Sequence, residues 1–305
     1  MGGRVALVFP GQGSQRIGML DDLPALDSVG RLLDAAEALS GFDLRRIAHS
    51  GTPAELSDTR VAQPLLFLCD WAWGVTLLGS GVVPVAVAGH SLGELAALAV
   101  ADVFSPEAGL ELVVERSRYM AVAVSDSPGT MSAILGLDAD LVADTIAGMS
   151  GVWLANDNSA GQVVISGTHE GVSEAASALA SAGARRVVPL PVSGPFHSPL
   201  MADAAESFGR LLSQATFQDA SYPIISNTDP YPSFDAELIR LRLMSQITSP
   251  VRWTETMHAM VAEGPITLIE AGPGAVLTGL AKRVEGATAV AIETAGLESV
   301  IEEVL

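Results

Sequence analysis

A serine at a sharp turn is the residue best placed for chemistry in this chain. Ser91 lies in the stretch 89–93, which reads Gly-His-Ser-Leu-Gly, between a valine-rich run over 82–88 and an alanine- and leucine-rich run over 95–100. A strand that turns directly into a helix holds the serine hydroxyl at the carboxyl edge of a sheet, and the glycines leave room for the turn. The pattern indicates a nucleophilic serine. Its alternative is an ordinary turn that closes a strand–helix unit.

The residues around Ser91 could also stabilise negative charge. The helix predicted to begin after the serine points its first backbone N–H groups at the site. A glycine-rich loop over 10–15 follows the first predicted strand, Arg4–Phe9, and Gln12 in that loop could offer its amide to an oxyanion. A simple flexible turn is the other interpretation. A dinucleotide site is not predicted, because Arg16 takes the third glycine position of that fingerprint.

Arg116 is a charged residue that spacing predicts to face inward. A helix opens at Ser105, with proline in its first position. Leu112, Arg116 and Met120 follow at intervals of four, so the arginine lies on or near the apolar stripe. A guanidinium keeps its charge, and its planar fork matches a carboxylate. Its partner would be either a buried Asp or Glu in a structural salt bridge, or the carboxylate of a substrate.

His197 is the candidate general base. Ser198 is a suitable N-cap and Pro199 suits the first helical position, so His197 stands in the loop just before a predicted helix. A histidine in a loop at a domain junction can reach into a cleft. A merely solvated loop histidine is the alternative.

The composition excludes several classes of protein. The chain has 305 residues and a formal net charge of −19, with 49% hydrophobic but only 5% aromatic residues. Such an aliphatic core is typical of α/β proteins with buried parallel strands. The negative charge argues against nucleic acid and anionic membranes as partners. Because no uninterrupted run of about 18 apolar residues and no signal-peptide pattern is found, we expect a cytoplasmic protein.

Two scarce residue types add further expectations. The single cysteine, Cys69, lies in an apolar run, so an internal disulfide is excluded and a buried thiol is predicted. The single lysine, Lys282, stands beside Arg283 near the end of a predicted helix. This pair either complements the helix dipole or docks an acidic partner. No cluster of residues has metal-ligand spacing, so we expect no metal.

A change of period near residue 127 predicts a second, smaller domain. From there the predicted order is strand, helix, strand, strand, helix, strand, with strands over 131–135, 152–156, 162–167 and 186–192 and helices over 139–147 and 170–182. This order is typical of a ferredoxin-like unit. The prediction divides the chain into a first large-domain part over 1–126, the small domain over 127–192 and a second large-domain part over 193–305. The connection over 156–161 is predicted to be a turn, with Asn158 as a polar lip of the cleft.

The remaining segments are predicted to complete the large α/β domain. Its further strands are expected over 82–88, 223–226, 266–270 and 287–292. Its further helices are expected over 62–78, 235–246 and 275–283, with another starting within 249–253. The helical patterns over 23–61 and 62–78 are interpreted as scaffold.

Four separated blocks occur in order along nearly the whole chain. They read Phe-Pro-Gly-Gln-Gly-Ser-Gln at 9–15, Gly-His-Ser-Leu-Gly-Glu at 89–94, Val-Ser-Gly-Pro-Phe-His-Ser at 192–198, and Glu-Ala-Gly-Pro-Gly at 270–274 with Leu-Thr-Gly-Leu at 277–280. Together they resemble the bacterial malonyl-CoA:acyl carrier protein transacylases. The resemblance implies a large α/β-hydrolase-like domain with a short parallel sheet, interrupted by an inserted ferredoxin-like α+β domain.

The resemblance also implies roles for the candidate residues. Ser91 would be the nucleophile that is acylated, and His197 its general base and acid. A main-chain carbonyl would orient the histidine, and Gln246 occupies the matching position. Arg116 would grip the malonyl carboxylate.

Further positions take supporting roles from the same resemblance. Gln12 and Leu92 would supply oxyanion N–H groups. Lys282 and Arg283 would meet the acidic carrier protein. Phe196, just before the histidine, favours malonyl over methylmalonyl, since related polyketide acyltransferases with an aromatic residue here use malonyl.

The implied reaction moves the malonyl group from malonyl-CoA to the phosphopantetheine thiol of acyl carrier protein through a Ser91 acyl-enzyme, without a cofactor. We expect a monomer. Alternatives with the same chemistry are a trans-acting acyltransferase of a polyketide synthase and the transacylase subunit of malonate decarboxylase. A plain serine esterase and a non-enzymatic carrier-binding module are alternatives from other classes.

Overall fold

A short parallel sheet forms the centre of the larger part of the molecule. The computed structural model describes residues 3–305. Four strands, in the order β2-β1-β8-β9, pair parallel throughout. They are β1 (Val5–Phe9), β2 (Ala86–Gly89), β8 (Ile266–Glu270) and β9 (Ala287–Ala291). The registry places Phe9 beside Gly89, so the loops that follow β1 and β2 emerge at the same edge of the sheet.

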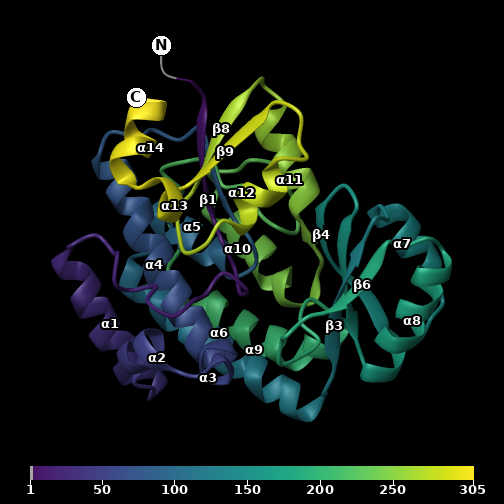
Figure 1. Cartoon of the computed structure of the whole chain (residues 1–305). Coiled ribbons are helices and arrows are strands. Elements are labelled where there is room, and N and C mark those ends of the chain that lie inside the picture. The colour runs from purple at the N-terminus through teal and green to yellow at the C-terminus, as the bar shows by residue number, and fades with distance from the viewer. Residues whose placement is uncertain (1–2) are drawn as a thin grey trace.

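Helices cover both faces of this sheet because alternate residues of β1 point to opposite sides. Val5, Leu7 and Phe9 belong to the larger core, together with buried residues of three helices: α4 (Thr59–Gly79), α5 (Gly93–Val100) and α6 (Pro106–Asp126). Ala6 and Val8 belong to a second core on the other face, with α11 (Trp253–Val261) and α12 (Val276–Ala281). Figure 1 shows the sheet enclosed between these two sets of helices.

Helix α4 is the most apolar long helix in this arrangement. Among residues 3–305 it alone is long and apolar enough to cross a membrane by length and composition, and 78% of its most apolar window is buried inside the protein. The helix starts at Thr59, before the expected position 62, because Asp58 accepts a hydrogen bond from the Arg60 N–H at its N-terminus. Its burial pattern is that of a core helix. Cys69 is fully buried in it, as expected.

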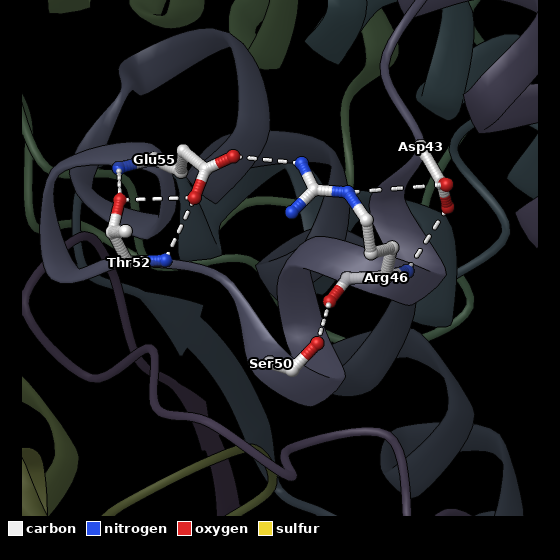
Figure 2. Close-up of polar contacts among 5 residues, drawn as sticks. All are labelled: Asp43, Arg46, Ser50, Thr52 and Glu55. Carbon is white, nitrogen blue, oxygen red and sulfur yellow. Dashed lines mark hydrogen bonds and ion pairs between the residues drawn. The ribbon is translucent and has the colours of Figure 1, made fainter.

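Short helices pack beside α4 at the start of the chain. They are α1 (Asp27–Ser40), α2 (Leu44–Ser50) and α3 (Pro53–Ser57). At the start of α3, Thr52 and Glu55 form a reciprocal capping box, and the Glu55 carboxylate also accepts a hydrogen bond from Arg46 of α2 (Figure 2). The other α-helices of this larger part are α9 (Ala202–Gln214), α10 (Ala236–Ser245), α13 (Ile292–Ala295) and α14 (Leu297–Val304).

A second sheet forms the smaller unit beside the first, drawn in teal and green in Figure 1. The predicted order of strand, helix, strand, strand, helix, strand is confirmed. The elements are β3 (Thr130–Leu135), α7 (Ala139–Ile146), β4 (Val152–Ser159), β5 (Gln162–Gly167), α8 (His169–Ser181) and β6 (Arg186–Pro189). The sheet order is β6-β3-β5-β4-β7, and the first four strands pair antiparallel. An aliphatic core that includes Ile134, Val163 and Leu179 fills the space under α7 and α8.

The fifth strand corrects two predictions. Residues 249–253 were expected to start a helix, but β7 (Val251–Arg252) pairs parallel with β4, and α11 begins only at Trp253. The segment 156–161 was expected to be a turn, but β4 continues through Ser159. The polar end of β4 is held as a strand by its pairing with β5 out to Ser159, with irregular registry. Residues 251–252 become a strand because they pair with Asn156 and Asp157 of β4, from a distant part of the chain.

Two smaller predictions are also wrong. The segment 223–226 is not a full strand, since only Ile224 forms isolated bridges, to Val87 and Ser233. Ser198 does not cap a helix, because its hydroxyl donates to the Pro195 carbonyl at 2.6 Å and a short 3₁₀ turn over Pro199–Met201 precedes α9. The α9 helix therefore begins three residues later than expected.

Candidate active site

The turn between β2 and α5 holds Ser91 in a strained conformation. Its φ is +52°, in the left-handed region that non-glycine residues rarely adopt. A Cβ atom at Gly89 would lie 1.9 Å from the carbonyl carbon of Gly93, and one at Gly93 would lie 2.1 Å from the backbone oxygen of Phe9. The two glycines are therefore required because the backbone passes too close for any side chain.

Ser91 and His197 meet across this edge of the sheet. The Oγ of Ser91 lies 2.8 Å from the Nε2 of His197. The Nδ1 of the same ring lies 3.1 Å from the backbone oxygens of both Gln246 and Ser249. Because a carbonyl oxygen only accepts, Nδ1 carries the proton and Nε2 is left to accept one from the serine. Two main-chain carbonyls thus take the place that an aspartate has in a Ser-His-Asp triad.

His197 is neutral in this environment. Burial, together with the positive charge of Arg116 and the proximity of His90, lowers its pKa to about 3, although the hydrogen bonds to the Gln246 and Ser249 carbonyls oppose the shift. The histidine also has a left-handed backbone, with φ at +55°, and only 5% of it is exposed. A neutral, fixed imidazole is the form that a general base requires.

Arg116 is fully buried beside the serine and has no carboxylate partner. Its Nη1 donates to Gln63 Oε1 at 2.7 Å, and its Nη2 donates to Gln246 Oε1 at 2.9 Å and to Ser91 Oγ at 3.2 Å. None of the ion pairs within the part of the chain that the structure describes involves this arginine. Burial lowers its pKa to about 10, and Glu94 opposes that shift. The structural salt bridge that the sequence left open is therefore not formed.

Gln246 joins the groups around the serine. Its side-chain Nε2 donates to the Ser91 carbonyl at 2.9 Å and to Glu94 Oε2 at 2.7 Å, while its Oε1 accepts from Arg116. Its backbone oxygen is one of the two that face His197. Gln246 thus contacts the backbone of Ser91, the ring of His197 and the guanidinium of Arg116.

Asn227 clamps the turn from behind and was not anticipated. Its Oδ1 accepts from the Ser91 N–H at 2.7 Å, and its Nδ2 donates to the Gly89 carbonyl at 2.6 Å. Its own N–H donates to Glu94 Oε2 at 3.2 Å. Burial raises the pKa of Glu94, whereas the hydrogen bonds from Gln246 and Asn227 lower it. The side-chain amide of Asn227 therefore bridges Gly89 and Ser91, and the Ser91 N–H is already hydrogen-bonded to it.

The oxyanion candidates lie next to the serine with free N–H groups. Within residues 3–305, the backbone N–H groups of Gln12 and Leu92 donate to no other protein group. The Gln12 side chain is held by hydrogen bonds that its Oε1 accepts from Thr59 and Gln63, at 3.0 and 3.2 Å. Gly11, which precedes it, packs against the backbone of His90, so the β1 loop sits directly over the turn. Both N–H groups are free to bind an oxyanion.

A cavity of about 240 Å³ opens above these residues, between the two sheets. Phe196 and Asn158 both line it, with Phe196 only 6% exposed. Asn158 lies on β4 rather than in a turn, and its Oδ1 pairs with His90 Nε2 at 2.8 Å. The other residues that line the cavity are Gly11, Gln12, Ser91, Met120, Met131, Ala133, Asn156, Gln162, Val164, Leu190, Val192, His197, Val276, Leu277 and Leu280.

The basic pair lies at the end of a helix that borders this cavity. Lys282 is exposed at the C-terminus of α12, whose residues Leu277 and Leu280 line the cavity. Arg283 is also exposed, and its Nη1 donates to Ser159 Oγ at 2.9 Å and to the Ala160 carbonyl at 3.2 Å. Arg283 therefore already ties α12 to the β4–β5 turn. Lys282 is the member of the pair whose side chain has no ion-pair partner among residues 3–305.

Sequence reasoning missed Gln63 in addition to Asn227 and Glu94. Gln63 lies on α4, in a segment interpreted as scaffold, yet its Oε1 binds Arg116. A signal was available, because a glutamine among apolar residues on a buried helix needs a polar partner. In residues 3–305, no group of three or more His, Cys, Asp or Glu side chains is arranged to hold a metal ion.

Comparison with known proteins decides the family. A family model described as an acyl transferase domain matches residues 6–295. The chain belongs to the acyl transferase family. Among curated relatives of this family, the malonyl CoA-acyl carrier protein transacylase of Synechocystis is 42% identical over 92% of this chain and 93% of its own length. The protein of the same name from Salmonella typhimurium is 41% identical over 92% of both chains.

Solved structures of this acyltransferase family have the same fold. The malonyl CoA-acyl carrier protein transacylase of Coxiella burnetii superposes with a TM-score of 0.93 at 34% identity, covering 100% of this chain and 98% of that one. A malonyl-transacylase in complex with a type II polyketide acyl-carrier protein superposes with a TM-score of 0.91 at 38% identity, covering 99% of each chain. This chain is therefore an acyltransferase.

Proposed function

We propose that this acyltransferase moves the malonyl group from malonyl-CoA to the phosphopantetheine thiol of acyl carrier protein, through an acyl-enzyme on Ser91. The single observation that carries this proposal is the fully buried guanidinium of Arg116, which lies 3.2 Å from the serine Oγ and has no carboxylate partner. A buried cation without a counter-ion is costly, and a substrate carboxylate would supply the missing charge. Malonyl differs from acetyl by that group.

The first half-reaction follows from the geometry of Ser91 and His197. His197 Nε2 takes the proton of Ser91 Oγ as the oxygen attacks the thioester carbonyl. The negative charge that forms on the carbonyl oxygen is bound by the free N–H groups of Gln12 and Leu92. The intermediate then expels the CoA thiolate, which receives the proton from His197, and the malonyl group remains on the serine.

The second half-reaction reverses these roles. The thiol of the carrier's phosphopantetheine gives its proton to His197, and its sulfur attacks the malonyl-serine ester. Collapse of the new intermediate returns the proton to Ser91 Oγ and releases malonyl carrier protein. Throughout, Arg116, whose Nη2 lies 3.2 Å from Ser91 Oγ, holds the malonyl carboxylate.

The fold supports two domains with different tasks. We propose an α/β-hydrolase-like large domain over 1–126 and 193–305 and an inserted ferredoxin-like domain over 127–192. The order β6-β3-β5-β4 of the antiparallel strands supports the second description. The large domain supplies the reacting groups, and the small domain supplies one wall of the cavity.

The carrier protein is proposed to dock near the exposed Lys282, with Arg283 beside it. The chain carries a net charge of −19, so an acidic partner needs a local basic site such as this one. The monomer is the proposed acting unit. Phe196, buried against the catalytic histidine in the cavity wall, is proposed to favour malonyl over the bulkier methylmalonyl.

A polyketide carrier is the second candidate for the acceptor. The observation that favours it is the TM-score of 0.91 with a malonyl-transacylase bound to a type II polyketide acyl-carrier protein. The transacylase subunit of malonate decarboxylase is a further alternative. The chemistry at Ser91 is the same in each case, so only carrier preference separates them.

Intact-protein mass spectrometry tests the proposal. After brief incubation with malonyl-CoA, we expect a malonyl adduct that is absent from Ser91→Ala and disappears when holo carrier protein is added. Acetyl-CoA and methylmalonyl-CoA serve as competing donors, and Arg116→Ala should lower malonyl transfer far more than acetyl transfer. Rapid loss of the adduct to water without a carrier would instead support a serine esterase, and no adduct with any donor would support a binding module.

A further inference from the structure

Glu94 is a buried acid that the reaction described above does not use. It is 1% exposed and lies in the first turn of α5, three residues after the nucleophile. Its Oε2 accepts hydrogen bonds from Gln246 Nε2 and from the Asn227 N–H, at 2.7 and 3.2 Å. No lysine or arginine in residues 3–305 forms an ion pair with it. Its function is therefore not that of a simple salt bridge.

A single amide separates this acid from the cation of the site. Gln246 donates from Nε2 to Glu94 and accepts at Oε1 from Arg116, at 2.9 Å. Both charged side chains are buried, where Coulomb interactions are screened least. Glu94 is the acid whose negative charge acts on Arg116 among the residues that the structure describes. The carboxylate thus balances part of the arginine's charge.

We propose that Glu94 determines how strongly the site prefers a carboxylated acyl group, by offsetting the charge of Arg116 through Gln246. This inference rests on the proposed function. An arginine with no counter-charge would bind the malonyl carboxylate more tightly, and the malonyl group would then be harder to release with the carrier protein. Glu94 therefore weakens the preference for malonyl over acetyl and permits turnover. It acts through Gln246 and never touches the substrate.

Glu94→Gln tests this, because glutamine keeps an oxygen to accept both N–H groups and removes the charge. We expect the ratio of kcat/KM for malonyl-CoA to that for acetyl-CoA to rise on the order of tenfold, the effect of one buried charge at close range. Both donors are measured on the same enzyme sample, so a loss of folded or active protein cancels from the ratio. A purely structural role would lower both values and leave the ratio unchanged.

Glu270→Gln is the matched control. Glu270 is also fully buried and accepts two backbone N–H bonds, from Leu277 and Thr278, but it makes no hydrogen bond to Gln246. Its loss should leave the ratio unchanged. An unchanged or lower ratio in Glu94→Gln, or an equal rise in Glu270→Gln, would overturn the inference. Two further measurements distinguish a failure of this inference from a failure of the proposed function. The proposed function fails if the wild-type enzyme shows no preference for malonyl-CoA, or if Arg116→Ala retains that preference.

Discussion

Ser91 and His197, the proposed nucleophile and base, both have left-handed backbones, but the protein holds them in different ways. Ser91 is fixed by its immediate neighbours, because strand β2 ends at Gly89, helix α5 begins at Gly93, and these glycines pack directly against each other. His197 is oriented by carbonyl oxygens that lie 49 and 52 residues further along the chain. Local backbone geometry therefore sets the turn at Ser91, which Asn227 then clamps, whereas tertiary contacts alone orient His197.

This difference between Ser91 and His197 indicates which substitutions the site tolerates least. On the serine side, a backbone contact leaves no room for any new atom. On the histidine side, hydrogen bonds from Nδ1 to the carbonyl oxygens of Gln246 and Ser249 maintain the geometry. A small shift weakens such bonds without a steric clash. We therefore expect failure to be abrupt where backbone atoms touch and graded where hydrogen bonds hold a group.

The largest effect is expected from Gly93→Ala. Its Cβ would lie 2.1 Å from the Phe9 carbonyl oxygen, so the turn and strand β1 must move apart. We expect the rate of serine acylation by malonyl-CoA to fall by more than about a thousandfold, since both the nucleophile and its oxyanion N–H groups are displaced. Gly279→Ala is the control, because a Cβ there meets nothing within 4 Å. Equal activity of the two variants would show that the close approach is not required.

A smaller effect is expected from Asn227→Ala, which removes the clamp behind the turn. The Ser91 N–H and the Gly89 carbonyl both lose their partner. We expect a free energy of unfolding lower by about 1–3 kcal/mol. We also expect a fall in kcat of about tenfold to a hundredfold, with KM nearly unchanged, because the serine is misplaced while the cavity walls remain. Rates are normalised to the fraction of enzyme that accepts a malonyl group. If each Asn227→Ala molecule that accepts a malonyl group still turned over at the wild-type rate, the hydrogen bonds of Asn227 would serve stability alone.

The smallest effect on the rate is expected when the pH is varied. Burial lowers the pKa of His197 to about 3, so the imidazole loses its proton-accepting form only as pH falls through that value. The single-turnover rate of acylation should therefore be flat between about pH 5 and pH 8, where an ordinary histidine would titrate. Arg116→Ala removes a charge that lowers this pKa, so any acidic limb should move to higher pH in that variant. A wild-type limb near pH 6.5 would contradict the buried, neutral base.

The same difference explains what could be predicted from the sequence. The turn around Ser91, the small sheet and the inward face of Arg116 follow from spacing within one element or between neighbours. Strand β7 could not be predicted, because two residues make a strand only when β4 is already beside them. Asn227 also carries no local pattern, and the position of Gln63 on an apolar helix shows that it needs a polar partner but not which one. Folding brings Gln63 of α4 to Arg116, and it brings Asn227, from the segment before β7, to the Ser91 N–H.

Strand β7 also has a mechanical consequence. It belongs to the segment that carries Gln246 and Ser249, yet it completes the sheet that supplies the opposite wall of the cavity. The pairing of β4 with β7 therefore ties the strand that presents Asn158 to the segment whose carbonyls orient His197. We expect a displacement of β4 to shift those carbonyls as well, so the width of the cavity and the position of the imidazole are mechanically coupled.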